Sequence, residues 1–260
     1  MASAVRPPVQ RAPAPASPVD LLLIPAFGLI GATLFSWALG VVIELVGIQV
    51  LWPEQGEEHS RAMVLEDLGY IAAAPRSLLV ADTVAFAQEI VGLVEWPYHH
   101  LGLVAWYRRH NGQAAQQAAA SRSPSFGGRQ QPAQPGIAAA SESLAAELSR
   151  WVLITMYVAQ DTLLRLAIAL FAAPAFVLAC LLGAVDGLVR RDLRRWGGAR
   201  ESSLVYHHAK RYTRWALTGG FTLYLSWPFG GFDPALMVLV FTALVAFSLS
   251  TTLATFKKYV

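Results

Sequence analysis

Long apolar runs separated by polar segments dominate the pattern of this 260-residue chain. The first run, residues 21–51, contains one ionisable residue, Glu44, and is long enough to cross a hydrocarbon core about 30 Å thick. Later runs predict a second transmembrane helix over 151–188, interrupted at Pro174, and a hairpin of two further helices over 215–254. The pattern therefore predicts an all-α integral membrane protein with four transmembrane helices.

The segments between and around these runs are more polar. Residues 1–20 are rich in proline and are expected to form a disordered tail, and residues 255–260 form a short second tail. Region 52–150 is expected to contain an amphipathic helix over 77–106 and a flexible linker over 111–140, which is rich in Gln, Ser, Gly and Pro.

A basic loop over 189–214 sets the expected orientation, because short positively charged loops favour the cytoplasm. Four spans place this loop and both tails on the cytoplasmic side and region 52–150 on the other side. A fifth crossing by 77–106 would move the basic loop outside, which argues against it. Segment 215–232 contains only a short apolar stretch, so a full span and a re-entrant hairpin both remain open.

Composition supports a membrane location. The chain is 55% hydrophobic and 14% charged, with a mean hydropathy of +0.44, whereas about a quarter of the residues in soluble domains are charged. Cys180 is the single cysteine and lies in an apolar run, so an internal disulfide framework and a thiolate metal site are both excluded.

Two stripes of small residues predict how the first two spans pack. One stripe in the first span leads to Glu44, and a stripe in the second span begins at Arg165. The predicted packing residues are Gly28, Ala32, Ser36 and Gly40 in the first span, and Ala169, Ala172, Ala175, Ala179 and Gly183 in the second. We expect Glu44 to pair with Arg165, since an unpaired charge in a membrane is costly. A buried locking pair is favoured over a proton or ion path, because a relay needs several ionisable groups in sequence.

The chain shows no recognisable catalytic or metal-binding pattern. Adjacent histidines on a helix, as in the pairs at 99–100 and 207–208, point about 100° apart and do not converge on one ion. The sequence contains no phosphate-binding loop, no Gly-x-Ser-x-Gly elbow and no His-Glu-x-x-His. We therefore expect no catalytic residues, no metal and no cofactor.

The basic loop admits three interpretations: a topology signal, an anionic-lipid contact, or a docking surface for an acidic partner or nucleic acid. Aromatic residues interleave with its charges, including Trp196 and Tyr206, and could stack on bases, but such aromatics are also expected at a headgroup interface. Topology with lipid contact is the simplest explanation, and we do not expect direct nucleic-acid binding.

A family resemblance is concentrated in residues 185–214. The string Val-Asp-Gly-Leu-Val-Arg-Arg-Asp-Leu-Arg-Arg, followed by Gly-x-x-Arg-Glu-Ser-Ser and Tyr-His-His-Ala-Lys, resembles the integrating conjugative element membrane proteins. These are small bacterial inner-membrane proteins of unassigned biochemical role. The positions expected to contact a partner or lipid are Arg190, Arg191, Arg194, Arg195, Arg200, Glu201, Tyr206, His207, Lys210 and Arg211. The resemblance provides no catalytic residues.

The resemblance implies a multi-pass inner-membrane protein with a part in conjugative DNA transfer through a type IV secretion system. We expect a non-enzymatic accessory protein that acts as an adaptor or assembly partner of the coupling ATPase or of a channel subunit. A small transporter or ion-conducting protein is the first alternative. The second is an exclusion or regulatory protein that acts through its non-cytoplasmic region.

Overall fold

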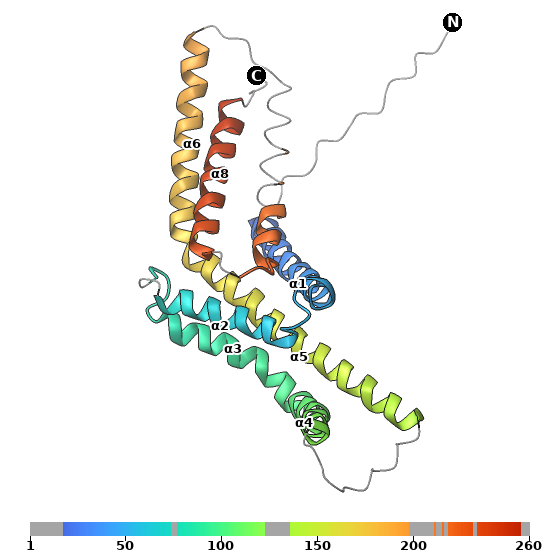
Figure 1. The fold of residues 1–260 in the computed structure, drawn as a ribbon. Helices are drawn as coiled ribbons and strands as arrows, with labels where there is room; N and C mark the ends of the chain where they lie inside the picture. The colour runs from blue at the N-terminus through green and yellow to red at the C-terminus, as the bar shows by residue number, and fades with distance from the viewer. Residues whose placement is uncertain are drawn as a thin grey trace, which may run out of the picture.

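A computed structural model describes residues 18–73, 77–122, 136–197, 211, 215, 218–230 and 233–255, and this part of the chain is all-helical (Figure 1). The helices are α1 (Pro18–Val50), α2 (Glu57–Ala73), α3 (Thr83–His100), α4 (Leu103–Arg122), α5 (Gly136–Phe171), α6 (Ala173–Trp196) and α8 (Pro234–Ala254). Residues 218–225 form a further short helical stretch before α8.

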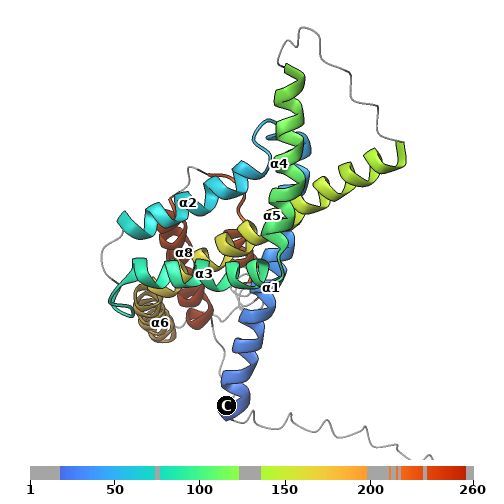
Figure 2. The same ribbon diagram turned by 90° about the horizontal axis from the view of Figure 1, so that it is seen from below.

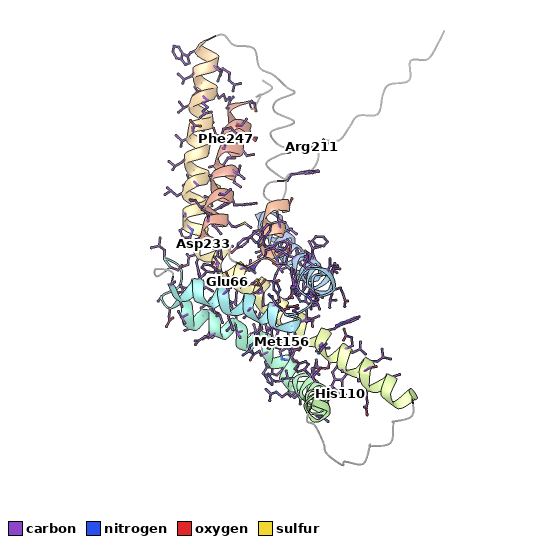
Figure 3. The ribbon with its side chains drawn as sticks, in the orientation of Figure 1. Glu66, His110, Met156, Arg211, Asp233 and Phe247 are labelled. Carbon is purple, nitrogen blue, oxygen red and sulfur yellow. The ribbon has the colours of Figure 1, made fainter. Side chains whose placement is uncertain are left out.

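Helix α5 is the centre of the fold, because α1, α2, α3 and α4 all pack against it. Leu164 of α5 is fully buried in a core with Val64 and Ile71 of α2 and Ala87 of α3. A second cluster surrounds Met156 of α5, and Figure 3 labels this residue in the middle of the helical layer. Both clusters of the apolar core therefore lie along a single long helix, α5.

One aspartate and one glycine set the helix boundaries within the amphipathic segment predicted over 77–106. Asp82 caps the start of α3 by accepting hydrogen bonds from the backbone N–H groups of Val84 and Ala85, at 3.1 and 2.9 Å. Gly102 then adopts a φ of +70°, which L residues avoid, and the chain turns into α4. The segment is therefore two helices, and the first begins at Thr83.

The linker expected over 111–140 is shorter than predicted, because helices occupy both of its ends. Helix α4 continues to Arg122 and α5 begins at Gly136, while residues 123–135 lie outside the described part of the chain. The run of Ala and Gln at 114–120 lacks large apolar residues but has a high helix propensity. Asn111 also ties α4 to α5 by donating a hydrogen bond to Ser149 Oγ at 2.9 Å.

The second span predicted over 151–188 is two helices that meet at Ala172. Helix α5 ends at Phe171, and Pro174 occupies the first turn of α6, where its missing N–H breaks no helical hydrogen bond. A proline at this place starts a new helix in a new direction instead of kinking a continuous one. The interruption predicted at Pro174 is therefore a boundary between two helices, and it lies two residues earlier in the chain.

Helix α6 pairs with α8 through unusually close backbone contact. A Cβ atom added at Gly183 would lie 2.5 Å from the carbonyl oxygen of Ala246, and one added at Gly187 would lie 2.5 Å from that of Ser250. Ser250 also donates a hydrogen bond to Asp186 at 2.6 Å. The two glycines, four residues apart, let the helices approach as small residues do in membrane helix pairs.

Four helices are long and apolar enough to cross a membrane: Ala26–Val50, Ala140–Phe171, Ala173–Trp196 and Pro234–Ala254. The predicted number of four spans is thus matched among the described residues, but two of the four helices, α5 and α6, come from the single span predicted over 151–188. Segment 215–232 is not among them, since its described helical stretch is 218–225. Among the described residues α8 pairs with α6, and the hairpin over 215–254 stays a prediction, because residues 216–217 and 231–232 lie outside the described part.

The candidate spans differ in direction and in burial. Helix α1 appears nearly end-on in Figure 1 and along its length in Figure 2, whereas α6 and α8 stand upright in Figure 1 and are foreshortened in Figure 2. Within the most apolar stretch of each helix, 56% is buried in α5 but only 11% in α6 and in α8. Helix α5 is therefore a core helix, and the α6–α8 pair projects from the layer formed by α1–α5.

The glycine contact gives a direct test of the α6–α8 pairing. We expect Gly183→Ala to destabilise the protein by about 1–3 kcal/mol, because the new methyl group would press on rigid backbone of α8. Thermal unfolding of the detergent-solubilised protein measures the change. Gly28→Ala is the matched control, since nothing lies within 4 Å of its added Cβ. Equal unfolding midpoints for the two variants would contradict the close pairing.

Candidate functional site: a buried charge cluster and a basic helix end

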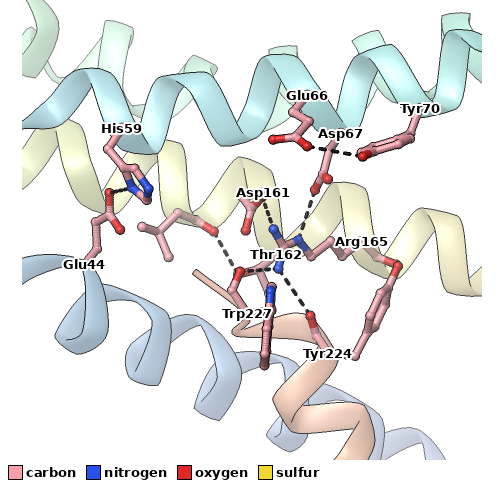
Figure 4. Close-up of polar contacts among 11 residues, drawn as sticks. Glu44, His59, Glu66, Asp67, Tyr70, Asp161, Thr162, Arg165, Tyr224 and Trp227 are labelled. Atoms are coloured by element: carbon pink, nitrogen blue, oxygen red, sulfur yellow. Dashed lines mark hydrogen bonds and ion pairs between the residues drawn. The ribbon is translucent and has the colours of Figure 1, made fainter. Parts of the chain in front are cut away.

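Four charged side chains meet where α1, α2 and α5 pack together (Figure 4). Glu44 of α1 is 3% exposed, Asp67 of α2 is 3% exposed, and Asp161 and Arg165 of α5 are 8% and 6% exposed. Charged groups are almost never buried to this degree unless they are paired. The cluster is therefore the most specific polar feature of the described structure.

Arg165 organises this cluster through its planar guanidinium group. Its Nε donates a hydrogen bond to Asp67 Oδ2 at 3.1 Å, and its Nη2 lies 3.2 Å from Asp161 Oδ1. Asp161 and Arg165 are one helical turn apart on α5, so their pairing is local, whereas Asp67 brings in α2. The arginine thus fixes α2 on the central helix.

The remaining Nη1 of Arg165 reaches the short helical stretch at 218–225. It donates to the carbonyl oxygen of Tyr224 at 3.3 Å and to that of Trp227. Carbonyl groups at a helix C-terminus lack partners within the helix, and a nearby cation stabilises them. Tyr224 in turn donates from its hydroxyl to the carbonyl oxygen of Arg165 at 3.2 Å. One side chain therefore joins α2, α5 and the segment that leads into α8.

Glu44 has its own partners on α2. Its Oε1 lies 2.8 Å from His59 Nδ1 and accepts a hydrogen bond from Ser60 Oγ at 2.6 Å. The His59 ring stacks on Trp52, with ring centroids 4.0 Å apart. These contacts fix the turn between α1 and α2, so that the end of the first apolar helix is locked to the start of the second helix.

The predicted Glu44–Arg165 ion pair is not among the ion pairs of the described residues. Both residues are buried and belong to one cluster, but each is paired with a different part of α2. Glu44 contacts His59 and Ser60, and Arg165 donates to Asp67. The prediction considered only the first two spans and gave Asp67 of region 52–150 no part in the pairing. A signal was present in the sequence, since Ser60, Val64, Asp67 and Ile71 recur every three or four residues and form the buried face of α2.

The predicted small-residue stripe of α1 is buried in part. Ser36 and Gly40 are buried, and Ser36 donates a hydrogen bond to the carbonyl oxygen of Thr222 at 3.4 Å. A Cβ at Gly40 would lie 2.9 Å from Val158 Cγ1, so α1 does pack closely on α5, but against a residue outside the predicted stripe. Gly28 at the other end is exposed, and Ala32 is half-buried.

The second predicted stripe is divided by the helix break at Ala172. Ala169 and Ala172 line an apolar cavity of about 270 Å³ that α1 closes with Leu29. Beyond the break, Ala175 is exposed, Ala179 is half-buried, and Gly183 contacts α8. The stripe therefore serves two different neighbours because the helix direction changes within it.

The basic residues at the end of α6 are the second candidate site. Arg190 and Arg195 are exposed, and Arg191 and Arg194 are half-buried, all within the last two turns. Arg190 pairs with Asp186 at 2.9 Å. Arg211 is exposed and is labelled in Figure 3. The other predicted contact residues, which lie outside the described part of the chain, are Arg200, Glu201, Tyr206, His207 and Lys210.

A smaller polar contact joins the outer helices. Tyr107 of α4 donates a hydrogen bond to Glu57 at 2.6 Å, and Arg150 of α5 lies 3.8 Å from the same carboxylate. Burial and the Glu57 carboxylate raise the pKa of the Tyr107 hydroxyl above its ordinary value. Within the described ranges, no group of three or more His, Cys, Asp or Glu side chains is arranged to hold a metal ion.

These features define a class of all-helical protein in which a pair of long apolar helices projects from a layer held by buried charges. The family model for DtrJ-like proteins, described as IncC plasmid conjugative DNA transfer proteins, matches residues 51–257. The chain belongs to this family. The match confirms an association with conjugative DNA transfer, and it names a plasmid family where the sequence resemblance indicated integrating elements. No curated protein and no solved structure matches the chain.

Double-mutant cycles distinguish the observed from the expected partner of Arg165. We expect Arg165→Gln and Asp67→Asn to show a coupling free energy of about 1–3 kcal/mol, because each single change leaves the other charge buried. Arg165→Gln and Glu44→Gln should couple by less than about 0.5 kcal/mol. Unfolding of the four forms of each cycle in detergent measures both values. A larger coupling to Glu44 would contradict the geometry.

Proposed function

We propose that this protein is a non-enzymatic inner-membrane accessory protein of a conjugative DNA-transfer apparatus of the type IV secretion kind. The observation that carries the proposal is the family match over residues 51–257, which includes α2 to α8. In this role the protein is an adaptor or assembly partner of the coupling ATPase or of a channel subunit.

The α6–α8 pair supports the membrane location. Its outer surface is apolar: Leu181, Leu182 and Val185 of α6 are 60–64% exposed, and Leu239 and Phe247 of α8 are 65% and 66% exposed. Exposed apolar side chains along two adjacent helices are typical of a surface that contacts lipid. We infer that this pair crosses the bilayer, while α5 remains in the protein core.

The basic end of α6 is the proposed contact with the partner. Arg190, Arg191, Arg194 and Arg195 lie at the end of an apolar helix, and positive charge at this position favours the cytoplasmic face. The coupling ATPase works on that face, so an acidic surface on it would meet these arginines. Contact with anionic lipid headgroups uses the same charges and is the competing outcome of the test below.

The buried charges favour an adaptor over a transporter. Two small cavities border the cluster, one beside Arg165 and one beside Glu44 and Asp161. Each is about 20 Å³, which is room for one water molecule and too little for a larger solute. The charges around them are engaged with one another and join three helices. An exclusion protein acting through residues 52–150 would instead depend on α2–α4, which the same mating experiments can address by deletion of residues 77–106.

Cys180, near the middle of α6, tests the membrane location with the unmodified chain. We expect this single cysteine to resist a water-soluble maleimide in intact membranes and to react after solubilisation in denaturing detergent, because lipid covers α6 in the bilayer. Labelling followed by mass spectrometry measures the reaction. The control replaces Cys180 by Ser and Arg109, an exposed residue of α4, by Cys, which should react in open membrane vesicles without denaturation. Rapid labelling of Cys180 in the membrane would contradict the proposed span.

The basic end of α6 is tested by replacing Arg190, Arg191, Arg194 and Arg195 with Gln. We expect mating frequency to fall at least tenfold and the coupling ATPase to be lost from co-purification, with insertion unchanged. The matched control replaces Arg108 and Arg109, two exposed arginines of α4, with Gln. Normal mating with normal co-purification would refute the proposed contact. Retained co-purification with loss of binding to anionic vesicles would assign the arginines to lipid.

A further inference from the structure

The buried cluster contains more negative than positive groups. The carboxyl groups are those of Glu44, Asp67 and Asp161, and the cations available to them are Arg165 and, when protonated, His59. Three negative and at most two positive charges leave a net charge of −1. An uncompensated ion in a protein interior costs several kcal/mol, and such groups neutralise themselves by binding a proton.

The three carboxyl groups are not equivalent. Asp67 accepts a hydrogen bond from Arg165 Nε, and Glu44 accepts one from Ser60 and contacts His59. Asp161 Oδ1 is buried and lies 3.2 Å from Arg165 Nη2, yet it makes no hydrogen bond of good geometry with any described residue. Hydrogen bonds stabilise the ionised form of a carboxyl group. Asp161 is therefore the carboxyl group least able to remain ionised.

Asp161 also faces a small polar cavity. This cavity has a volume of about 20 Å³ and is bordered by Glu44, Ser60, Asp161, Ser226 and Trp227, among others. Such a volume is sufficient for one water molecule, and the carboxyl and hydroxyl groups around it supply hydrogen-bond partners. A protonated Asp161 can donate its proton to a water molecule in this cavity.

The neighbouring elements add no further cation on the described side chains of this cluster. From α1 the facing group is Glu44, from α2 they are His59 and Asp67, and from the segment before α8 it is the neutral Tyr224. On α3, Glu95 accepts a hydrogen bond at 3.2 Å from Gln160, the residue before Asp161. The surrounding helices therefore increase the negative potential around Asp161.

We propose that Asp161 is a proton-binding site that holds a proton at neutral pH, while Glu44 pairs with His59 and Asp67 pairs with Arg165. The site goes beyond the function proposed above and does not depend on it. Its ligand is a proton, with one water molecule in the adjoining cavity. Loss of the proton would place a second carboxylate beside Asp67 and weaken the junction of α1, α2 and α5.

The proposal fixes the sign of a pH dependence. In the unfolded chain an aspartate is ionised at pH 7, so the folded protein binds one more proton than the unfolded one. Stability therefore falls as pH rises, and each extra proton increases the equilibrium constant for unfolding up to tenfold per pH unit. The same proton count predicts that Asn, which resembles a protonated Asp, is tolerated at residue 161.

The experiment compares the full-length detergent-solubilised protein with Asp161→Asn between about pH 5.5 and 8.5. The slope of the free energy of unfolding against pH gives the number of protons that unfolding releases, and we expect it to be smaller by about one proton in the variant. At the highest pH the variant should be as stable as the native protein. Asp192→Asn, at an exposed position of α6, is the matched control and should leave the slope unchanged. An unchanged slope in Asp161→Asn would overturn the proposal.

Infrared spectroscopy gives a second readout, and its first measurement uses the native protein alone. The native protein at pH 7 should show the carbonyl stretch of a protonated carboxyl group buried away from water, and Asp161→Asn should lack it. Absence of the band in the native protein, or its loss in Glu44→Gln in place of Asp161→Asn, would refute the assignment. Replacing sodium by choline at constant ionic strength should change neither readout, and stabilisation by sodium that requires Asp161 would assign the site to that cation.

Discussion

The structure depends on one buried guanidinium group. Arg165 uses its fork of donors to contact Asp67 on α2, Asp161 on its own helix, and two carbonyl groups at the end of the stretch 218–225. A lysine could not replace it, because a single ammonium group cannot direct donors into three directions in one plane. The position of α2 and the start of the segment leading to α8 are both fixed by this residue.

The described structure has two parts that are stabilised by different interactions. The layer of α1–α5 is held by an apolar core on α5 and by the charge cluster. The α6–α8 pair is held by backbone contact at Gly183 and Gly187, with Asp186 and Ser250 as a polar link. Cavities of about 270 and 580 Å³ lie at the junction between the two parts, so that α6 and α8 contact each other far more closely than they contact the layer.

In the function proposed above, the two parts have different roles. The layer gives a base held by buried ion pairs, and the paired helices carry arginines at their far end. We infer that the base orients the pair and that the pair presents its basic end to a partner. The buried cluster therefore serves the position of the arginines, and the proton proposed at Asp161 limits the negative charge buried in it.

The sequence alone determined the all-helical character, the apolar helices and the link to conjugation, because hydrophobic periodicity and the motif over residues 185–214 are local properties. It also identified Glu44 and Arg165 as buried. Their partners were decided only by tertiary structure, since Asp67 lies almost a hundred residues from Arg165 in the chain. The pairing of α6 with α8 and the break at Ala172 were likewise decided in three dimensions, because composition does not reveal which of two apolar helices a glycine face will meet.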